Sequence, residues 1–281
     1  MYLPDHHGSI GVFDSGIGGL SVANAICGLL PRESQLYVAD NARAPYGART
    51  DAEVLDYSRQ ITEFLLAAGV KLVVVACNTA TSVAIDALRA SYPDVPFVGL
   101  EPAVKPAAAG RHVGIMATAV TLRSARYLDL RARYLSDRPV WEDPCAGLVP
   151  LIEAYGSGSP EVGEYLRALL PPAGVLDTLV LGCTHYPLIL EDIRAVAGPG
   201  VHIIDPSGAA ARQVQRLLER RGLCVPKTAS GGRCDFHSTG GPAPLQRTLL
   251  QLPLLNKTRR WVTPYLAANP PHGHLSYRST L

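Results

Sequence analysis

The sequence is poor in charge, and especially in lysine. Charged residues make up 18% of its 281 residues, and the formal net charge is +2. A balance this even does not favour nucleic acid or an anionic membrane as the main partner. The chain has only four lysines, Lys71, Lys105, Lys227 and Lys257. An enzyme that uses pyridoxal phosphate needs a Schiff-base lysine, so candidates for that chemistry are scarce.

Targeting segments and long apolar runs are also missing. The first ten residues, MYLPDHHGSI, contain no basic stretch followed by an apolar one, so we expect no signal peptide. The longest apolar stretch, FLLAAGVKLVVVAC, is interrupted by Gly69 and Lys71 and is too short to span a bilayer. We therefore expect a soluble, cytoplasmic protein.

The cysteines lack the spacing of a redox or metal motif. Six of them are scattered along the chain, at positions 27, 77, 145, 183, 224 and 234. In a cytosolic chain of this length they are expected to be thiols. No C-x-x-C pair occurs, which argues against a thiol redox protein. Cys224, Cys234 and His237 do not have a recognised zinc spacing, so we expect no metal site. Cys27 fits a core position, and the sequence gives Cys145 no role.

What the chain does contain is apolar sequence, 47% of it, in alternating strand and helix patterns. Strand patterns cover residues 9–16, 34–40, 70–77 and 96–100, separated by helical patterns over 19–30, 51–69 and 81–92. Asp51 or Thr50 can cap the second helix, and Gly69 ends it. The run VKLVVVAC is typical of a strand buried on both faces. This order predicts a parallel sheet with helices on both sides.

The pattern then restarts. Strands are expected at 111–118, 177–183 and 201–205, with an extended piece at 139–145 and helices at 121–135, 158–170, 187–197 and 206–222. LVLGCTHYPLILEDIR resembles VVVACNTATSVAIDALR with one residue deleted. A duplicated α/β domain explains this match, and chance similarity between two buried units is the alternative. We predict an α/β protein of two similar domains. Residues 1–98 plus 208–281 form the first, to which a C-terminal helix returns, and residues 99–207 form the second. After Leu255 we expect loops or disorder.

Chemically useful residues follow several of these strands. Asp14 and Ser15, Cys77 to Thr79, Thr118 to Thr121, and Cys183 to His185 each lie where a strand ends and a helix begins. In a parallel sheet the functional crevice lies at these carboxyl ends. A helix N-terminus lowers the pKa of a cysteine and binds carboxylates or phosphates through its free N–H groups. We therefore expect a site for a small anion next to two reactive thiols.

Each feature also has a purely structural interpretation. Cys77 could be a small core residue, Asp14 an ordinary cap, and Tyr46 a packed loop aromatic. His185 could cap a helix or lie at the surface, and beside Cys183 it could equally relay a proton. GVFDSGIGGLSV suggests a nucleotide loop, but it is neither G-x-G-x-x-G nor a P-loop.

Together, these segments resemble the glutamate racemases of the cofactor-independent, two-cysteine aspartate/glutamate racemase family. The matching stretches are GVFDSGIGGLSV, PYG at 45–47, ACNTAT, ATAVT at 117–121, VPLIE at 149–153 and GCTHYPL. They occur in the family order over residues 8–220. DSGIGGLSV, CNTAT and CTHYP are specific in combination, although none of them is specific alone.

The resemblance implies an isomerase whose two α/β domains face each other across a central cleft. It implies interconversion of L- and D-glutamate without a cofactor, which supplies D-glutamate for peptidoglycan and thus for cell wall biogenesis and cell shape. By position it makes Cys77 and Cys183 the acid/base residues, assisted by Asp14 and His185 respectively. Glu153 matches a family glutamate on the side of the second cysteine. The substrate contacts it implies are Asp14, Ser15, Pro45, Tyr46, Gly47, Asn78, Thr79, Thr118, Thr121, Thr184 and His185. Because family members form dimers, we expect a homodimer.

Two thiols suit this reaction. Racemisation removes the Cα proton from one face and returns a proton to the other, so two opposed groups are needed, one thiolate and one thiol. Two alternatives stay open. The chain could be a racemase of the same group that acts on aspartate or a hydantoin, which comparing turnover of L-glutamate and L-aspartate would decide. It could also be a non-catalytic nucleotide-binding α/β protein, which would show a nucleotide-induced thermal shift and no Cα exchange.

Overall fold

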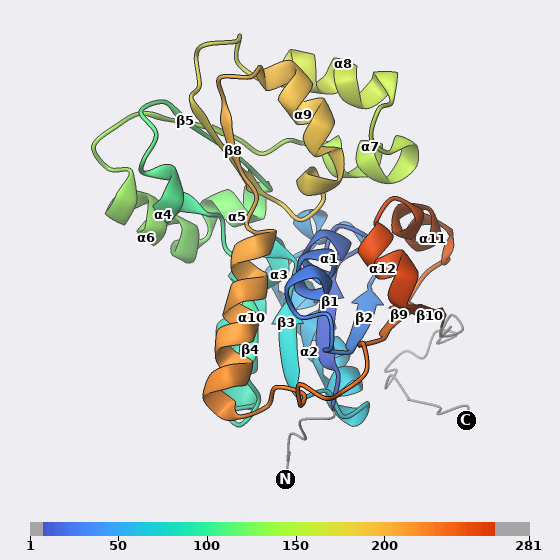
Figure 1. Cartoon of the computed structure of the whole chain (residues 1–281). Coiled ribbons are helices and arrows are strands. Elements are labelled where there is room, and N and C mark those ends of the chain that lie inside the picture. Colours follow the sequence, from blue (N-terminus) through green and yellow to red (C-terminus); the bar gives the residue numbers. More distant parts are fainter. Residues whose placement is uncertain (1–7, 262–281) are drawn as a thin grey trace.

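The computed structural model describes residues 8–261 and contains two parallel sheets (Figure 1). Sheet A has the order β10-β9-β2-β1-β3-β4 and sheet B the order β6-β5-β7-β8. The strands of sheet A are β1 (Ile10–Asp14), β2 (Gln35–Ala39), β3 (Leu72–Val75), β4 (Phe97–Gly99), β9 (Cys234–Ser238) and β10 (Arg259–Trp261). Those of sheet B are β5 (Val113–Ala117), β6 (Val140–Asp143), β7 (Thr178–Gly182) and β8 (His202–Ile204). Every strand pair is parallel, which confirms the predicted fold class.

Helices cover both sheets. The helices packed with sheet A are α1 (Leu20–Leu29), α2 (Asp51–Ala67), α3 (Asn78–Ser91), α10 (Ser207–Arg221), α11 (Ala243–Leu250) and α12 (Pro253–Thr258), and a 3₁₀ turn, η1, spans Tyr46–Ala48. Around sheet B lie α4 (Val104–Ala107), α5 (Ala119–Arg123), α6 (Ala125–Tyr134), α7 (Leu148–Tyr155), α8 (Pro160–Leu169), the 3₁₀ turn η2 (Tyr186–Ile189) and α9 (Leu190–Ala197).

Strand β3 shows why the central strands have continuous apolar sequence. Leu72 and Val74 belong to one core cluster, with residues of α1 and α10, whereas Val73 and Val75 belong to another, with residues of α2 and α3. All four side chains are fully buried. A fully buried Val or Leu contributes about 1.5–3 kcal/mol relative to an exposed one. The apolar run therefore holds β3 in the centre of sheet A and fixes where the strand ends, just before Cys77.

Helix α2 begins and ends at the residues that its sequence indicates. Thr50 is its N-cap, and the pair Thr50–Glu53 forms a capping box: the Glu53 N–H donates to the Thr50 hydroxyl oxygen, and the Thr50 N–H donates to the Glu53 carboxylate. Such a cap stabilises a helix by about 1 kcal/mol. Gly69, with φ of +75°, follows the helix end in a left-handed conformation that suits glycine.

The chain passes from sheet A to sheet B between β4 and β5, and returns to sheet A between β8 and β9. In Figure 1 helix α10 runs from the sheet B part down beside α1 and β4. Its Val214 and Leu218 share a core cluster with α1. The domain boundaries at 98/99 and 207/208 stay a prediction.

Several details differ from the sequence expectations. Residues 253–258 form α12, and residues 259–261 pair with β9 as strand β10, so the chain directly after Leu255 is not a loop. The rest of that tail, residues 262–281, lies outside the described residues. Strand β9 and helices α4, α7 and α11 have no counterpart in the predicted elements, and the helix predicted over 121–135 is divided into α5 and α6 at Ser124. Finally, β3 leads straight into α3, whereas β7 is followed by the 3₁₀ turn η2 before α9 begins.

Within the described residues, no helix combines the length and the apolar character needed to cross a membrane. The six cysteines all lie in this part of the chain, and all of them except Cys224 are buried. Residues 8–261 also contain no group of three or more His, Cys, Asp or Glu side chains arranged to hold a metal ion.

Candidate active site

The carboxyl ends of four strands, two from each sheet, meet between the sheets. Asp14 ends β1 and Cys77 follows β3, while Thr118 follows β5 and Cys183 follows β7. Two side-chain contacts join these segments directly across the gap. The Thr184 hydroxyl donates to Asp14 Oδ1 at 3.0 Å, and the hydroxyl oxygens of Thr79 and Thr118 lie 3.0 Å apart. The four segments singled out in the sequence are therefore brought together.

Cys77 is the N-cap of α3 and is 5% exposed. Its Sγ accepts a hydrogen bond from the Ala80 N–H at 3.4 Å and lies 3.7 Å from Ser15 Oγ. Burial, with a smaller contribution from the charge of Asp14, raises the pKa of the Cys77 thiol to about 12. The helix N-terminus lowers this pKa through Ala80, but by less. The expectation of a lowered pKa at Cys77 is therefore wrong, because desolvation outweighs the helix terminus.

Cys183 begins a chain of three polar groups. Its Sγ lies 3.9 Å from His185 Nδ1, and His185 Nε2 lies 2.8 Å from Glu153 Oε1. Burial alone lowers the pKa of His185, but the hydrogen bonds to Cys183 and Glu153 outweigh it and raise the pKa to about 10. Burial acts to raise the pKa of Glu153, but the hydrogen bond and the charge of His185 outweigh burial and lower this pKa. His185 is thus a buried imidazolium that can donate to the Cys183 sulfur.

Asp14 is completely buried, between the groups that surround Cys77 and those that surround Cys183. Its carboxylate accepts hydrogen bonds from the Thr184 hydroxyl and, at 2.9 Å, from the Gly16 N–H. Burial raises the pKa of Asp14, while the His185 charge and these two donors lower it and only partly compensate. Asp14 acts on Cys77 through its charge, since its hydrogen bonds go to Thr184, Gly16 and Gly19.

Hydroxyl and amide groups surround the space between the sheets. Thr118 Oγ1 lies 3.0 Å from Thr121 Oγ1 as well as from Thr79 Oγ1, so three hydroxyls from α3 and α5 form one chain. Asn78 is 2% exposed and its amide donates to the Leu100 carbonyl at 3.4 Å, but its Oδ1 accepts no hydrogen bond from the described residues. A buried acceptor without a donor is suited to binding an N–H group of a ligand.

In the 45–47 segment, Gly47 lies against the other side of the site, whereas the Tyr46 hydroxyl bonds a residue of its own side. The peptide bond between Ala44 and Pro45 is cis. Tyr46 is buried, and its hydroxyl donates to Asp40 Oδ2 at 2.5 Å, on the side of the segment's own loop. Gly47 is exposed and faces the other sheet, because a Cβ placed on it would lie 3.5 Å from Thr118 Cβ. Asp40, which holds Tyr46, was not singled out in the sequence.

The glycines of DSGIGG allow a close approach between the two sides. A Cβ on Gly16 would lie 2.6 Å from Glu153 Oε1, and one on Gly18 would lie 2.5 Å from His185 Nδ1 and 2.8 Å from the His185 backbone nitrogen. Real Cβ atoms do not come so close to other atoms. These positions are filled by the protein's own side chains and leave no room for a phosphate, which argues against the nucleotide-loop interpretation.

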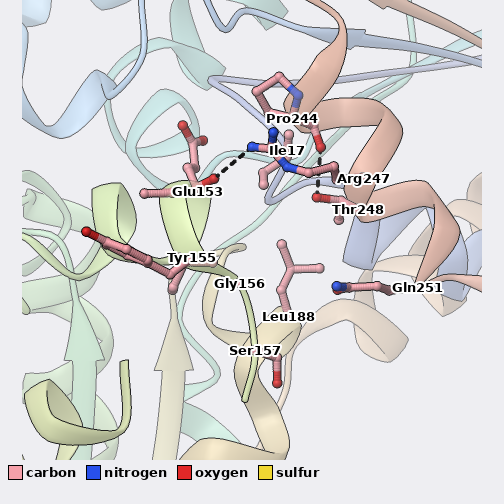
Figure 2. A pocket seen from close by; sticks show the side chains of 12 residues that line it. Ile17, Glu153, Tyr155, Gly156, Ser157, Leu188, Pro244, Arg247, Thr248 and Gln251 are labelled. Atoms are coloured by element: carbon pink, nitrogen blue, oxygen red, sulfur yellow. Dashed lines mark hydrogen bonds between the residues drawn. The ribbon is translucent and has the colours of Figure 1, made fainter. Parts of the chain in front are cut away.

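A surface pocket lies beside Glu153, between α7 and α11 (Figure 2). Arg247 from α11 donates to the Glu153 backbone carbonyl at 3.4 Å, while the Glu153 side chain bonds His185. Neither Cys77 nor Cys183 lines this pocket. The two thiols, 5% and 6% exposed, are enclosed between the sheets.

Comparison with known proteins identifies relatives of this arrangement. Residues 20–214 match the family described as Asp/Glu/Hydantoin racemase, a span that includes Cys77, Glu153 and Cys183. The chain is 46% identical over 251 residues to the glutamate racemase of Ectopseudomonas mendocina (strain ymp), covering 88% of this chain and 94% of that one. Glutamate racemase from Thermus thermophilus, solved with β-chloro-D-alanine, is 38% identical with a TM-score of 0.78, over 94% of this chain and 98% of that one. Escherichia coli glutamate racemase, solved with L-glutamate and the activator UDP-MurNAc-Ala, is 34% identical with a TM-score of 0.77, over 87% and 95% of the two chains.

Proposed function

The chain belongs to the Asp/Glu/hydantoin racemase family and is an amino-acid racemase, and on that premise we propose that it interconverts L- and D-glutamate by two-base proton transfer at Cα. One observation carries the mechanism: two buried thiols, one after a strand in each sheet, lie on the two sides that the Thr184–Asp14 and Thr79–Thr118 contacts bring together. The relatives named for glutamate support the choice of substrate.

The different surroundings of the two thiols distribute the protons. Cys77, with its pKa raised to about 12, keeps its proton near neutral pH. His185 supplies the positive charge that a thiolate on Cys183 needs. In this state Cys183 takes the Cα proton from one face of glutamate while Cys77 delivers its proton to the other. The roles of the two sulfurs reverse for the opposite enantiomer.

The enclosed site stabilises the carbanion that forms at Cα. The Cα–H bond of an amino acid is very weakly acidic, so the developing charge needs preorganised donors in a dry environment. The N-termini of α3 and α5, with the hydroxyls of Thr79, Thr118 and Thr121, are placed to hold carboxylates. Asn78 Oδ1 is placed to accept from an ammonium group. We assign substrate contacts also to Asp14, Ser15, Pro45, Tyr46, Gly47, Thr184 and His185.

Substrate entry requires the two sides to separate, because both thiols are buried in the structure. Closure afterwards excludes water and brings Thr184 to Asp14 and Thr79 to Thr118 across the gap. The proposal includes a cytoplasmic homodimer that works without a cofactor and supplies D-glutamate for peptidoglycan.

Proton exchange in heavy water tests the function. The purified full chain, without added cofactor, is incubated with L-glutamate or D-glutamate in D₂O, and Cα deuterium is followed by NMR together with optical rotation. We expect deuterium at Cα and convergence of both enantiomers to the same mixture. L-Aspartate in a parallel reaction should turn over far more slowly. Folded protein that exchanges neither enantiomer of glutamate would contradict the proposal, and faster exchange of aspartate would contradict its substrate.

A further inference from the structure

The residues 14–19, which we call the glycine loop, connect the surroundings of the two thiols. On one side the loop carries Asp14, whose carboxylate accepts from the Gly16 N–H. On the other side the Ile17 N–H hydrogen-bonds the Glu153 carboxylate, and Gly18 lies directly against His185. A shift of this loop therefore moves groups beside both Cys77 and Cys183.

Tyr37 fixes this loop from beneath. It lies in the middle of β2, is completely buried, and packs in the core cluster shared with α1. Its hydroxyl donates to the Gly16 carbonyl at 2.8 Å and accepts from the Gly19 N–H. A Cβ on Gly19 would lie 2.9 Å from this hydroxyl oxygen and 2.6 Å from Asp14 Cβ, so the loop is closely packed against both groups.

We propose that Tyr37 is a positioning residue for racemisation: its hydroxyl, bonded to the Gly16 carbonyl and the Gly19 N–H, holds the glycine loop so that Asp14 and the Glu153–His185 pair keep their places beside the two thiols. The inference rests on the proposed racemase function. It assigns a role to a side chain that reaches the reacting groups only through backbone atoms of the loop.

The electrostatic surroundings make Tyr37 a permanent donor. Burial raises the pKa of Tyr37 well above its ordinary value, and the charges of Asp14, Cys77 and Glu153 raise it further. The phenol therefore stays neutral and donates to Gly16 throughout the pH range of an assay. It does not exchange protons with the thiols, so its contribution is geometric.

The hydrogen bonds of Tyr37 to the glycine loop also affect the ionisation of Asp14. Hydrogen bonds from the Gly16 and Gly19 N–H groups lower the pKa of Asp14 against the effect of burial. The titratable groups that face Asp14 are His185, Cys77 and Tyr37 itself. When the loop is released, its two donors no longer stay aligned with the carboxylate, so the pKa of Asp14 rises. The acid limb of the kcat/KM profile then moves to higher pH.

The test compares Tyr37→Phe with Tyr127→Phe in the full-length chain. Tyr127 is 1% exposed, and its hydroxyl donates to Glu142 beside sheet B, away from the glycine loop. Each variant loses a tyrosine hydroxyl together with its hydrogen bonds, so both melting temperatures should fall, by roughly 2–4 °C. Only Tyr37→Phe should lower kcat for glutamate, by about 10- to 100-fold, with KM changed less than about threefold. Only Tyr37→Phe should move the acid limb upward.

The inference requires both kinetic changes in Tyr37→Phe, the lowered kcat and the upward shift of the acid limb. A Tyr37→Phe variant whose kcat matches that of Tyr127→Phe overturns the inference, as does a lowered kcat with an unmoved acid limb. The unsubstituted chain is assayed in the same series. If it fails to racemise glutamate, the proposed function fails; if it racemises glutamate and Tyr37→Phe does so equally well, only the inference about Tyr37 fails.

Discussion

The hydroxyl of Thr184 donates to Asp14 Oδ1 at 3.0 Å, and this bond joins the end of β7 in sheet B to the end of β1 in sheet A. Each of these two residues belongs to the surroundings of one thiol. Thr184 directly follows Cys183, and the charge of Asp14 raises the pKa of Cys77. The contact therefore links the closed arrangement of the two sides to the ionisation of a buried carboxylate.

Replacing Thr184 by Val should weaken this link. The lost bond is one of those that lower the pKa of Asp14 against burial, so the pKa should rise and the acid limb of kcat/KM should move to higher pH. We expect kcat/KM for glutamate to fall by about tenfold or more and stability to drop by about 1.5–3 kcal/mol, the range for a hydrogen bond to a charged group. Steady-state kinetics across pH and urea unfolding measure the two effects.

Thr178→Val is the matched control. Thr178 lies at the opposite end of β7, and its hydroxyl also donates to a carboxylate, that of Asp177, at 2.8 Å. This variant should keep the pH profile unchanged. Equal kinetic losses in both variants would mean that the Thr184 bond has no specific role.

Serine substitutions of the two thiols should each abolish racemisation. Cys77→Ser and Cys183→Ser replace a proton carrier by a far weaker acid, so we expect losses of about a thousandfold or more. Folding should survive in both. Serine is a good helix N-cap, so α3 should keep its start in Cys77→Ser. Circular dichroism and the heavy-water exchange assay are the measurements.

Cys224→Ser controls for the loss of any thiol, because Cys224 is exposed and outside the site. It should racemise at the normal rate. A Cys77→Ser or Cys183→Ser variant that also does so would disprove the two-base assignment.

The basic limb of the pH profile should depend on Glu153. Its hydrogen bond is among the interactions that raise the pKa of His185 to about 10. Glu153→Gln keeps the size of the side chain and removes its charge, so the pKa of His185 should fall. If the reaction needs the imidazolium, the basic limb of kcat/KM should move to lower pH. Glu164→Gln, at an exposed position of α8, should leave that limb in place.

Stability should follow the same group with a defined sign. His185 binds its proton more tightly in the folded state than in the unfolded state, where its pKa is about 6.5. Its contribution is therefore fully present below about pH 6.5 and is lost as the pH rises toward 10. In Glu153→Gln this loss should end at a lower pH, which urea unfolding at a series of pH values can show. An identical pH dependence in both proteins would mean that Glu153 does not control His185.

The sequence was enough to place the ends of the central strands. Residues 72–75 are buried on both faces, so this part of the sequence is a continuous apolar run. The polar residue that ends such a run can be read directly from the sequence. Depth of burial is not visible in this way. The rule for helix N-termini indicated a lowered pKa for Cys77, yet desolvation raises it, because Cys77 lies between two packed sheets.

Contacts made through backbone atoms also could not be predicted from the sequence. Tyr37 looks like any core aromatic of a strand, since its partners are the Gly16 carbonyl and the Gly19 N–H. The Glu153–His185 contact depends on how α7 packs, and α7 was not among the predicted helices. Strand β9, with the sequence CDFHS, carries three polar residues within five and lacks the apolar run that marked the central strands.

The close packing of the glycine loop gives a last prediction. Gly18→Ala places a Cβ about where His185 now lies, 2.5 Å from Nδ1 and 2.8 Å from the backbone nitrogen. The backbone contact cannot be relieved by turning a side chain, so the loop and the 183–185 segment must move apart. We expect a stability loss of about 1–3 kcal/mol and a fall in kcat of about 100-fold. Gly163→Ala, in α8, meets only the end of the Arg167 side chain at 3.4 Å or more. It should raise stability by about 0.5–1 kcal/mol, because alanine favours the helix, and leave kcat unchanged. Thermal unfolding and glutamate turnover of the two variants separate a loss specific to the loop from a general intolerance of Gly→Ala changes; full activity in Gly18→Ala would show that the two sides do not need this approach to react.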